Sequence, residues 1–293
     1  MAIAQRAQPL AAAAIVPELT QREFAFTDAD FRALAQVAYR AAGISLSESK
    51  RNLLYSRLSR RLRQLGLESF TAYRALLDSD TAEIESFINS ISTNHTKFFR
   101  ESHHFEHLRT NVALPFAQGA RTGTAKRLRI WSAGCSSGEE PYTVAVVLKR
   151  EIPDLAARDV KILATDIDTE VLGKAAHGYF AANATDDVPR GYQEFFRSDK
   201  EGGRVSVADD VREAISFRRL NLMDEWPFHG PFDAIFCRNV IIYFDAPTKT
   251  RLIERFTQML RPGGWLYIGH SESLIGSHPG LQSVGRTAYR RTP

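Results

Sequence analysis

The sequence predicts an α/β protein, in which a doubly wound, mostly parallel sheet follows an all-α N-terminal domain. Residues 24–92 place apolar side chains at helical spacing, without a strand pattern. From Leu128 onward, short apolar strands alternate with amphipathic helices. Such alternation is typical of a parallel sheet covered by helices on both faces. The glycines of "DKEGGRVSV" interrupt it and predict a small antiparallel β insertion at about 190–217.

Four helices are expected in the N-terminal region. Thr27 is suited to cap the first helix ahead of an acidic turn, and Gly43 to end it. A second helix is expected from about Ser49 to Leu65, followed by shorter ones near 70–77 and 82–90. We therefore divide the chain into a flexible tail (1–23), a helical domain (24–93) and an α/β domain (94–293).

Bulk composition excludes several classes of protein. The net charge of +4 over 293 residues does not by itself predict binding to nucleic acid or to a membrane surface. The two cysteines form no CxxC pattern, so we expect reduced thiols in a cytoplasmic protein. No apolar run approaches the roughly 18–20 residues of a spanning helix. The apolar stretch near residue 12 is too short and too poorly charged for a signal peptide, which favours a tail.

The expected strands of the α/β domain end in polar or small residues. In chain order these strands lie in "RLRIWSAG", "VKILATDID", "FDAIFCRNVIIYF", "WLYIGHSE" and "RTAYRR". The carboxyl ends of parallel strands share one edge, where ligands bind in open sheets. Four segments are expected to meet there: Ser132–Gly138, Asp166, Arg238–Asn239 and Gly269–Glu272.

The loop after the first strand favours a nucleoside ligand without a phosphate. It contains Gly134 and Gly138 but no GxGxxG, and Glu139 and Glu140 open the following helix. Carboxylates would compete with a pyrophosphate for the helix N-terminus, whereas they suit a cationic group. Asp166 ends the next strand, where an acidic side chain commonly binds ribose hydroxyls. Together these features describe S-adenosylmethionine, the alternative being ordinary turn and cap residues.

Two further stretches allow more than one interpretation. In "NSISTNHTKFFRE", either a capped helix start packs two phenylalanines, or the interdomain segment closes over the ligand with Arg100 reaching the site. Between Ser49 and Leu67 there are six basic residues and no acidic one. This helix is either a solvated face or a docking surface for an anionic partner, such as nucleic acid or an acidic protein surface.

Three other patterns do not predict chemistry. "HHFEH" has an i,i+4 histidine pair, but it lacks HExxH spacing and a third ligand, so we expect no metal site. "GHSES" contains residue types of a catalytic triad, yet neighbouring residues cannot form its geometry. Cys237 ends an apolar strand and is interpreted as a small hydrophobic residue.

Six stretches in order resemble the chemotaxis receptor methyltransferases, the CheR family. They are "KRNLLYSRLSRRLRQLGL", "NHTKFFRE", "WSAGCSSGEEPY", "ATDIDTEVL", "NLMDEWPFHGPFDAIFCRNVIIYFD" and "LRPGGWLYIGHSESL". The resemblance covers almost the whole chain from about Phe24. It implies a Rossmann-like class I methyltransferase fold. It also implies transfer of a methyl group from S-adenosylmethionine to glutamates on the cytoplasmic helical region of chemoreceptors, with S-adenosylhomocysteine as product, in sensory adaptation.

The resemblance also implies roles for individual residues. The donor site would comprise Asn94, Thr96, Arg100, Gly134, Glu140, Asp166, Asn221, Leu222, Arg238 and Asn239. Within it, Glu140 would meet the donor's ammonium and Asp166 its ribose. Tyr243 would lie beside the methyl group, and Arg100 would orient the carboxylate or the donor. Arg57, Arg60 and Arg61 would dock the receptor. Some family members also bind a receptor C-terminal peptide as an added strand on the β insertion, and we expect a monomer.

Three alternatives of other classes remain. The first is a non-catalytic scaffold that senses S-adenosylmethionine or S-adenosylhomocysteine and docks receptors. The second is a nucleic-acid methyltransferase, against which "RNVIIY" stands where an Asn-Pro-Pro-Tyr motif would be. The third is a nicotinamide dehydrogenase, against which GxGxxG is lacking.

Overall fold

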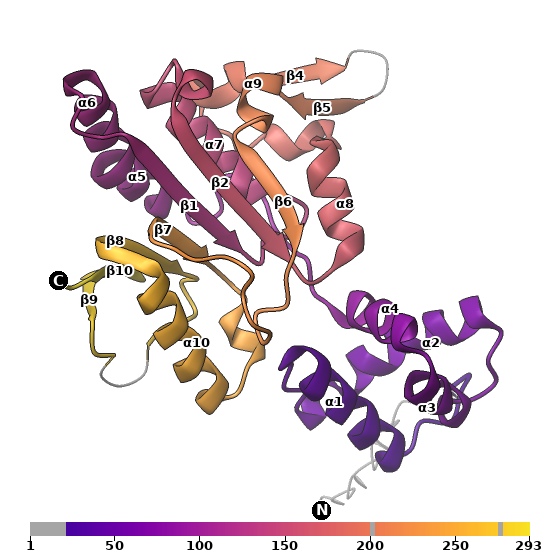
Figure 1. Ribbon diagram of the computed structural model, residues 1–293. Helices are drawn as coiled ribbons and strands as arrows, with labels where there is room; N and C mark the ends of the chain where they lie inside the picture. Colours follow the sequence, from indigo (N-terminus) through magenta and orange to yellow (C-terminus); the bar gives the residue numbers. More distant parts are fainter. Residues whose placement is uncertain (1–21, 200–202, 275–277) are drawn as a thin grey trace, which may run out of the picture.

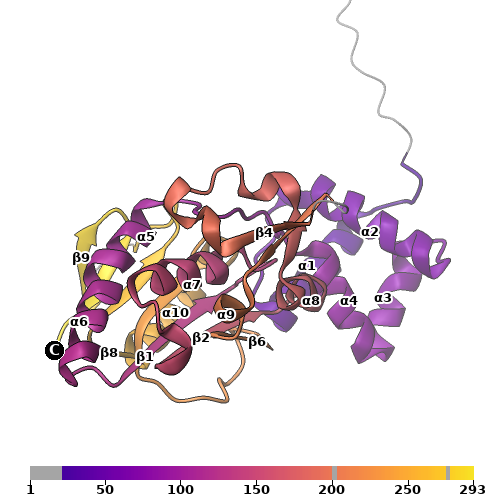
Figure 2. The same cartoon turned by 90° about the horizontal axis from the view of Figure 1, so that it is seen from above.

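The structure, a computed structural model, describes residues 22–199, 203–274 and 278–293. Most of the expected tail, 1–23, lies outside the described residues. Figure 1 shows a helical domain beside a larger α/β domain, and Figure 2 shows that the helical domain sits to one side of the sheet. No helix in the described ranges is long and apolar enough to cross a membrane.

The helical domain has its own core. Its elements are α1 (Asp28–Ala42), the 3-10 turn η1 (Glu48–Lys50), α2 (Arg51–Leu65), α3 (Phe70–Ser79) and α4 (Thr81–Ile91). Thr27 caps α1 by accepting a hydrogen bond from the Asp30 backbone at 3.1 Å, and Gly43 ends the helix in the left-handed region. Apolar stripes on the four helices bury a cluster that includes Leu34, Leu58 and Phe87.

The α/β domain contains a seven-stranded sheet of order β6-β2-β1-β7-β8-β10-β9. Its strands are β1 (Arg127–Ala133), β2 (Asp159–Asp166), β6 (Ile215–Arg219), β7 (Phe232–Cys237), β8 (Leu260–Ile268), β9 (Leu281–Gly285) and β10 (Ala288–Arg291). β10 pairs antiparallel with β8 and β9, and the other pairs are parallel. The predicted doubly wound, mostly parallel fold is confirmed.

Helices cover both faces of this sheet. They are α5 (His103–Leu108), the π segment η2 (Arg109–Ala113), α6 (Leu114–Thr122), α7 (Glu139–Glu151), α8 (Thr169–His177), α9 (Asp209–Arg212) and α10 (Ala246–Met259), with 3-10 turns η3 (Leu155–Ala157), η4 (Ala182–Thr185), η5 (Arg190–Phe195) and η6 (Ile241–Tyr243). Adjacent residues of β1 serve opposite faces. Ile130 belongs to the core formed with α5 and α7, and Trp131 to the core formed with α10.

The β insertion differs from the predicted range. A small antiparallel sheet of order β3-β5-β4 is formed by β3 (Tyr179–Ala181), β4 (Phe196–Asp199) and β5 (Arg204–Val207). The insertion therefore begins before residue 190, and Ile215–Arg219 is instead the edge strand of the main sheet. The predicted range was wrong for two reasons. β3 has only three residues, which is too short for an alternating strand pattern in the sequence, and the sequence of β6 looks like a further strand of the same hairpin. The predicted turn of the insertion includes residues 200–202, which lie outside the described residues.

The two domains meet where the parallel strands end. In Figure 1 the arrowheads of β1, β2 and β6 point toward the helical domain. The Ser45 backbone donates to the Tyr243 carbonyl at 2.8 Å, and the Asn221 amide donates to the Ala41 carbonyl at 2.9 Å. Gly43 packs so closely on Met223 that a Cβ would lie 2.6 Å from its sulfur. The carboxyl edge of the sheet is thus partly roofed by helices.

Candidate functional site

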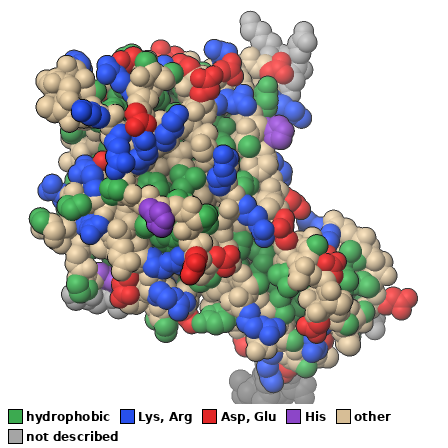
Figure 3. Space-filling view, viewed as in Figure 1, with side chains coloured by type: hydrophobic (Ala, Val, Ile, Leu, Met, Phe, Trp, Pro, Cys, Tyr) green, Lys and Arg blue, Asp and Glu red, His purple; other side chains and the backbone are tan. Residues whose placement is uncertain are grey.

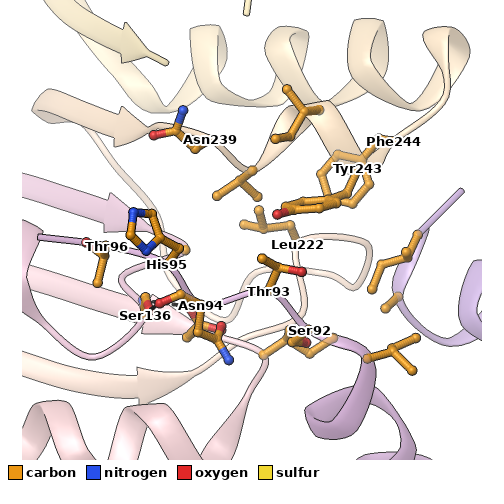
Figure 4. A pocket seen from close by; sticks show the side chains of 18 of the residues that line it. Ser92, Thr93, Asn94, His95, Thr96, Ser136, Leu222, Asn239, Tyr243 and Phe244 are labelled. Carbon is orange, nitrogen blue, oxygen red and sulfur yellow. Dashed lines mark hydrogen bonds between the residues drawn. The ribbon is translucent and has the colours of Figure 1, made fainter. Parts of the chain in front are cut away.

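A cavity of about 580 Å³ lies between the sheet edge and the helical domain. The strand order reverses between β1 and β7, and the cavity opens at this switch point, where open α/β sheets bind ligands. All ten predicted donor contacts line it, and so do Tyr243 and Arg57. Figure 4 shows Asn239 and Tyr243 on one side and the segment Thr93–Thr96 on the other.

The loop after β1 brings the backbone close to this cavity. Gly134 has φ of 87°, and a Cβ on it would collide with Val240 from the β7 side. The backbone N–H groups of Gly134 and Cys135 both donate to the Thr165 carbonyl, at 2.8 and 2.9 Å. These bonds tie the ends of β1 and β2 together and leave Gly134 facing the ligand space.

Asp166 ends β2 and organises the neighbouring loop. Its carboxylate accepts hydrogen bonds from the Ser136 backbone at 2.7 Å and from the Asp168 backbone at 3.0 Å. Burial raises the pKa of Asp166, while these backbone bonds oppose the rise. A carboxylate has about four lone-pair sites, so Asp166 retains acceptor capacity toward the cavity that it lines.

Glu140 forms a buried ion pair. One oxygen accepts from the Ser132 hydroxyl at 2.7 Å and the other from the Arg238 guanidinium at 3.0 Å. Burial raises the pKa of Glu140, and the Arg238 charge works against that rise. A ligand ammonium that binds Glu140 would therefore share its carboxylate with Arg238. The sequence did not predict this ion pair.

Arg238 links this pair to the interdomain segment. Its guanidinium donates to the Arg100 carbonyl and lies 3.4 Å from Glu101 Oε2. Burial alone would raise the pKa of Glu101, but hydrogen bonds from His270 and the Arg238 charge bring it to about 2. Glu101 is thus ionised at neutral pH.

The segment Ser92–Glu101, here called the linker, crosses the strand ends. Asn94 donates to Asp168 at 2.6 Å, and its carbonyl accepts from the Ser136 hydroxyl at 2.9 Å. Phe98 anchors the linker by packing edge-on against Phe180 of the small β insertion. The interpretation of a segment that closes over the ligand is supported, because Asn94, Thr96 and Arg100 all line the cavity.

Arg100 and Tyr243 approach the cavity from different elements. The Arg100 guanidinium donates to the His95 carbonyl at 2.8 Å, within the linker. Tyr243 ends η6, and its hydroxyl points into the cavity (Figure 4). Among the described residues Arg100 has no ion-pair partner, so its charge is not neutralised by a carboxylate.

A buried glutamate that sequence reasoning did not assign shapes the turn after β7. Glu272 accepts hydrogen bonds from the backbone N–H groups of Asn239 at 2.8 Å, Gly269 at 2.5 Å and Ile242 at 3.1 Å. Asn239 lies in the left-handed region, with φ of 60°. The sequence indicated only that Glu272 is a polar residue just after a strand, and this position was the one signal that could have pointed to its role.

The three predicted docking arginines lie in different surroundings. Arg57 donates to linker atoms, and Arg61 pairs with the buried carboxylate of Glu83 at 2.5 Å. Arg60 is exposed and has no hydrogen bond or ion pair with the described residues. Figure 3 shows positive and negative side chains interspersed on one face of the helical domain. Of the three, only Arg60 presents an unpaired charge to solvent.

The histidines of "HHFEH" separate in the structure. His107 approaches the Tyr267 hydroxyl at 2.9 Å, whereas Glu101, His103 and His104 bring potential metal ligands within 4.8 Å of one another. Arg238 already places a positive charge beside Glu101. His104 Nε2 donates to the Arg286 carbonyl at 2.8 Å, because a carbonyl oxygen can only accept a hydrogen bond. These residues take part in hydrogen bonds that join the start of α5 to the loops near His270 and Arg286.

Comparison with protein families gives two matches that follow the domain division. Residues 29–92 match the family model described as "CheR methyltransferase, all-alpha domain". Residues 94–290 match "CheR methyltransferase, SAM binding domain". The second match begins within the linker, at Asn94.

Curated relatives are similar over nearly their whole length. A probable chemotaxis protein methyltransferase of Rhizobium etli is 45% identical over 260 residues, covering 87% of this chain and 96% of the relative. Chemotaxis protein methyltransferase 2 of Pseudomonas aeruginosa is 43% identical, covering 93% and 96%. The chemotaxis protein methyltransferase of Escherichia coli is 40% identical, covering 96% of both chains. With both family domains matched in order around the cavity, the chain belongs to the CheR methyltransferase family, whose donor is S-adenosylmethionine.

Proposed function

We propose that this methyltransferase esterifies specific glutamate side chains on the helical cytoplasmic region of chemoreceptors. The observation that carries the proposal is the cavity at the switch point, which all ten predicted donor contacts line and which the helical domain partly covers. The relatives' names support the chemotaxis context. The chain would act in the cytoplasm, where that receptor region lies.

The residues at the rim fit S-adenosylmethionine. Asp166 offers acceptors for the ribose hydroxyls, and Asn221 and Leu222 border space for the adenine. The Glu140–Arg238 pair offers one charge of each sign to an amino acid zwitterion. Gly134 leaves room beside them. When bound, S-adenosylmethionine supplies an electrophilic methyl group.

The chain's own task is alignment rather than proton transfer. A glutamate has a reference pKa of about 4.3, so it is ionised at neutral pH and needs no general base. Alignment of reacting groups is worth about 7–11 kcal/mol at best. In this proposal Arg100 orients the incoming carboxylate or the donor, and Tyr243 positions the attacking oxygen; neither gives up a proton.

Receptor docking would involve the exposed face of α2, with Arg60 as its unpaired charge. A receptor C-terminal peptide could also add to an edge of the small sheet, at β3 or β4. These partner assignments rest on the family resemblance.

The proposal is tested by incubating the protein with labelled S-adenosylmethionine and a receptor cytoplasmic fragment. A glutamyl methyl ester releases methanol in mild base, which distinguishes it from a methylated amine. We expect base-labile label on the fragment, lost when its methylated glutamates are changed to alanine. Binding of donor and fragment without transfer would favour the scaffold alternative instead.

A further inference from the structure

One arginine of α2 is fastened to the start of the linker. Arg57 donates through Nη1 to the carbonyls of Ile91 and of Ser92, the latter at 2.7 Å. Through Nη2 it donates to the Thr93 hydroxyl at 2.9 Å. One guanidinium thus binds three consecutive residues of the protein itself.

These contacts satisfy the end of a helix. Ile91 is the last residue of α4, and its final turn contains no basic side chain of its own. The last carbonyls of a helix lack intrahelical donors and carry partial negative charge. Arg57 supplies both donor and charge from a different helix. It is also half-buried, and burial lowers its pKa.

The same contacts fix where the linker enters the cavity. Asn94 follows Thr93 directly and is held on its other side by Asp168 and Ser136. The stretch that leads to Thr96 is therefore fastened at both ends, by α2 and by the sheet edge. The Ser92 hydroxyl also donates to the Ile88 carbonyl of α4 at 2.8 Å, whereas the hydrogen bond from Arg57 is the only one that joins Thr93 to the helical domain among the described residues.

We infer that Arg57 is a positioning residue of the methyl-donor site, which places the linker side chains Asn94 and Thr96, rather than a docking residue for the receptor. This inference rests on the proposed function and on the donor contacts that the family resemblance implies for Asn94 and Thr96, both of which line the cavity. It separates two arginines that lie three positions apart on one helix. Arg57 serves the donor, and Arg60 serves the protein substrate.

The test measures S-adenosylhomocysteine binding by calorimetry for wild type, Arg57→Lys, Arg57→Ala and Arg60→Ala. We expect at least a tenfold weaker Kd for both Arg57 variants, because an ammonium cannot span the three acceptors that the planar guanidinium reaches. Arg60→Ala should bind S-adenosylhomocysteine as wild type does. In Arg60→Ala the KM for a receptor fragment should rise. In the Arg57 variants the KM for the donor should rise instead.

A milder variant keeps the test decisive if Arg57→Ala fails to fold. Thr93→Val removes one acceptor of Arg57 and preserves side-chain shape, so a roughly threefold weaker Kd is expected from the loss of one hydrogen bond. A Kd within twofold of wild type in Arg57→Lys would overturn the inference, since charge alone would then suffice. Binding is measured without turnover, so a failure of glutamate methylation would leave this result readable.

Discussion

The carboxylate of Glu272 holds the turn after β7, and replacing it by glutamine tests that role. Its two oxygens receive three backbone N–H groups, from Asn239, Gly269 and Ile242. Glutamine has the same length but only one oxygen. Placed toward Asn239 and Gly269, that oxygen keeps two bonds, and the amide NH₂ then faces the Ile242 N–H as a second donor.

The magnitude follows from this count. A hydrogen bond to a charged acceptor contributes about 1.5–3 kcal/mol, and Glu272→Gln loses at least one. Relief of charge burial offsets part of the loss, because burial raises the pKa of Glu272. We therefore expect about 1–3 kcal/mol of destabilisation, or a Tm lower by about 2–12 °C in a protein of this size.

The assay combines thermal unfolding with S-adenosylhomocysteine calorimetry. The Kd should weaken along with the Tm, since Asn239 lines the cavity and depends on this turn. Ser271→Ala is the matched control, because Ser271 is exposed and adjacent to Glu272. A variant with the Tm and the Kd of wild type would refute the reasoning that the carboxylate shapes the site.

Three further predictions concern the linker, the docking face and pH. Arg100→Ala should lower kcat about 10²-fold with an unchanged Tm, because a misplacement of the reacting groups by about 1 Å costs about that much. Kinetics with a receptor fragment measures this change, and wild-type turnover would remove Arg100 from the mechanism. Salt screens attraction between exposed charges, so Arg60→Ala should make the KM for the fragment less dependent on salt, as measured over roughly 50–300 mM. Burial and the Arg238 charge lower the pKa of His104 to about 3 from 6.5. The unfolded chain therefore gains this proton first, and the free energy of unfolding should fall as pH drops from about 6.5 toward 3. Denaturant titrations should show a shallower fall in His104→Gln, and an unchanged slope would contradict the assignment.

Much of the fold followed from local patterns in the sequence. Alternating strands and helices, the Thr27 cap and the Gly43 stop each involve neighbouring residues, whose preferences are strong without tertiary help. The β insertion was placed less well, because β3 has only three residues. No elements were predicted for residues 103–122, which form α5, the π segment η2 and α6.

The donor site was predicted as a set because parallel strands bring their carboxyl ends to one edge. What the sequence could not show was how each side chain is engaged there. Arg57 and Arg60 lie on one side of a helical projection, yet only the position of α4 decides that Arg57 meets the linker. Glu272 binds backbone amides brought together by two strand ends, a contact without a sequence signature.

The most direct test of the central claim, that the interdomain cavity holds the methyl donor, is calorimetric titration of S-adenosylhomocysteine. Wild type and Asp166→Ala are compared, with Asp166→Asn as the variant that keeps an acceptor for the Ser136 backbone. The account predicts micromolar binding by wild type, weaker binding by Asp166→Asn and none detectable in Asp166→Ala. Equal binding by Asp166→Ala, or no binding by wild type, would contradict it.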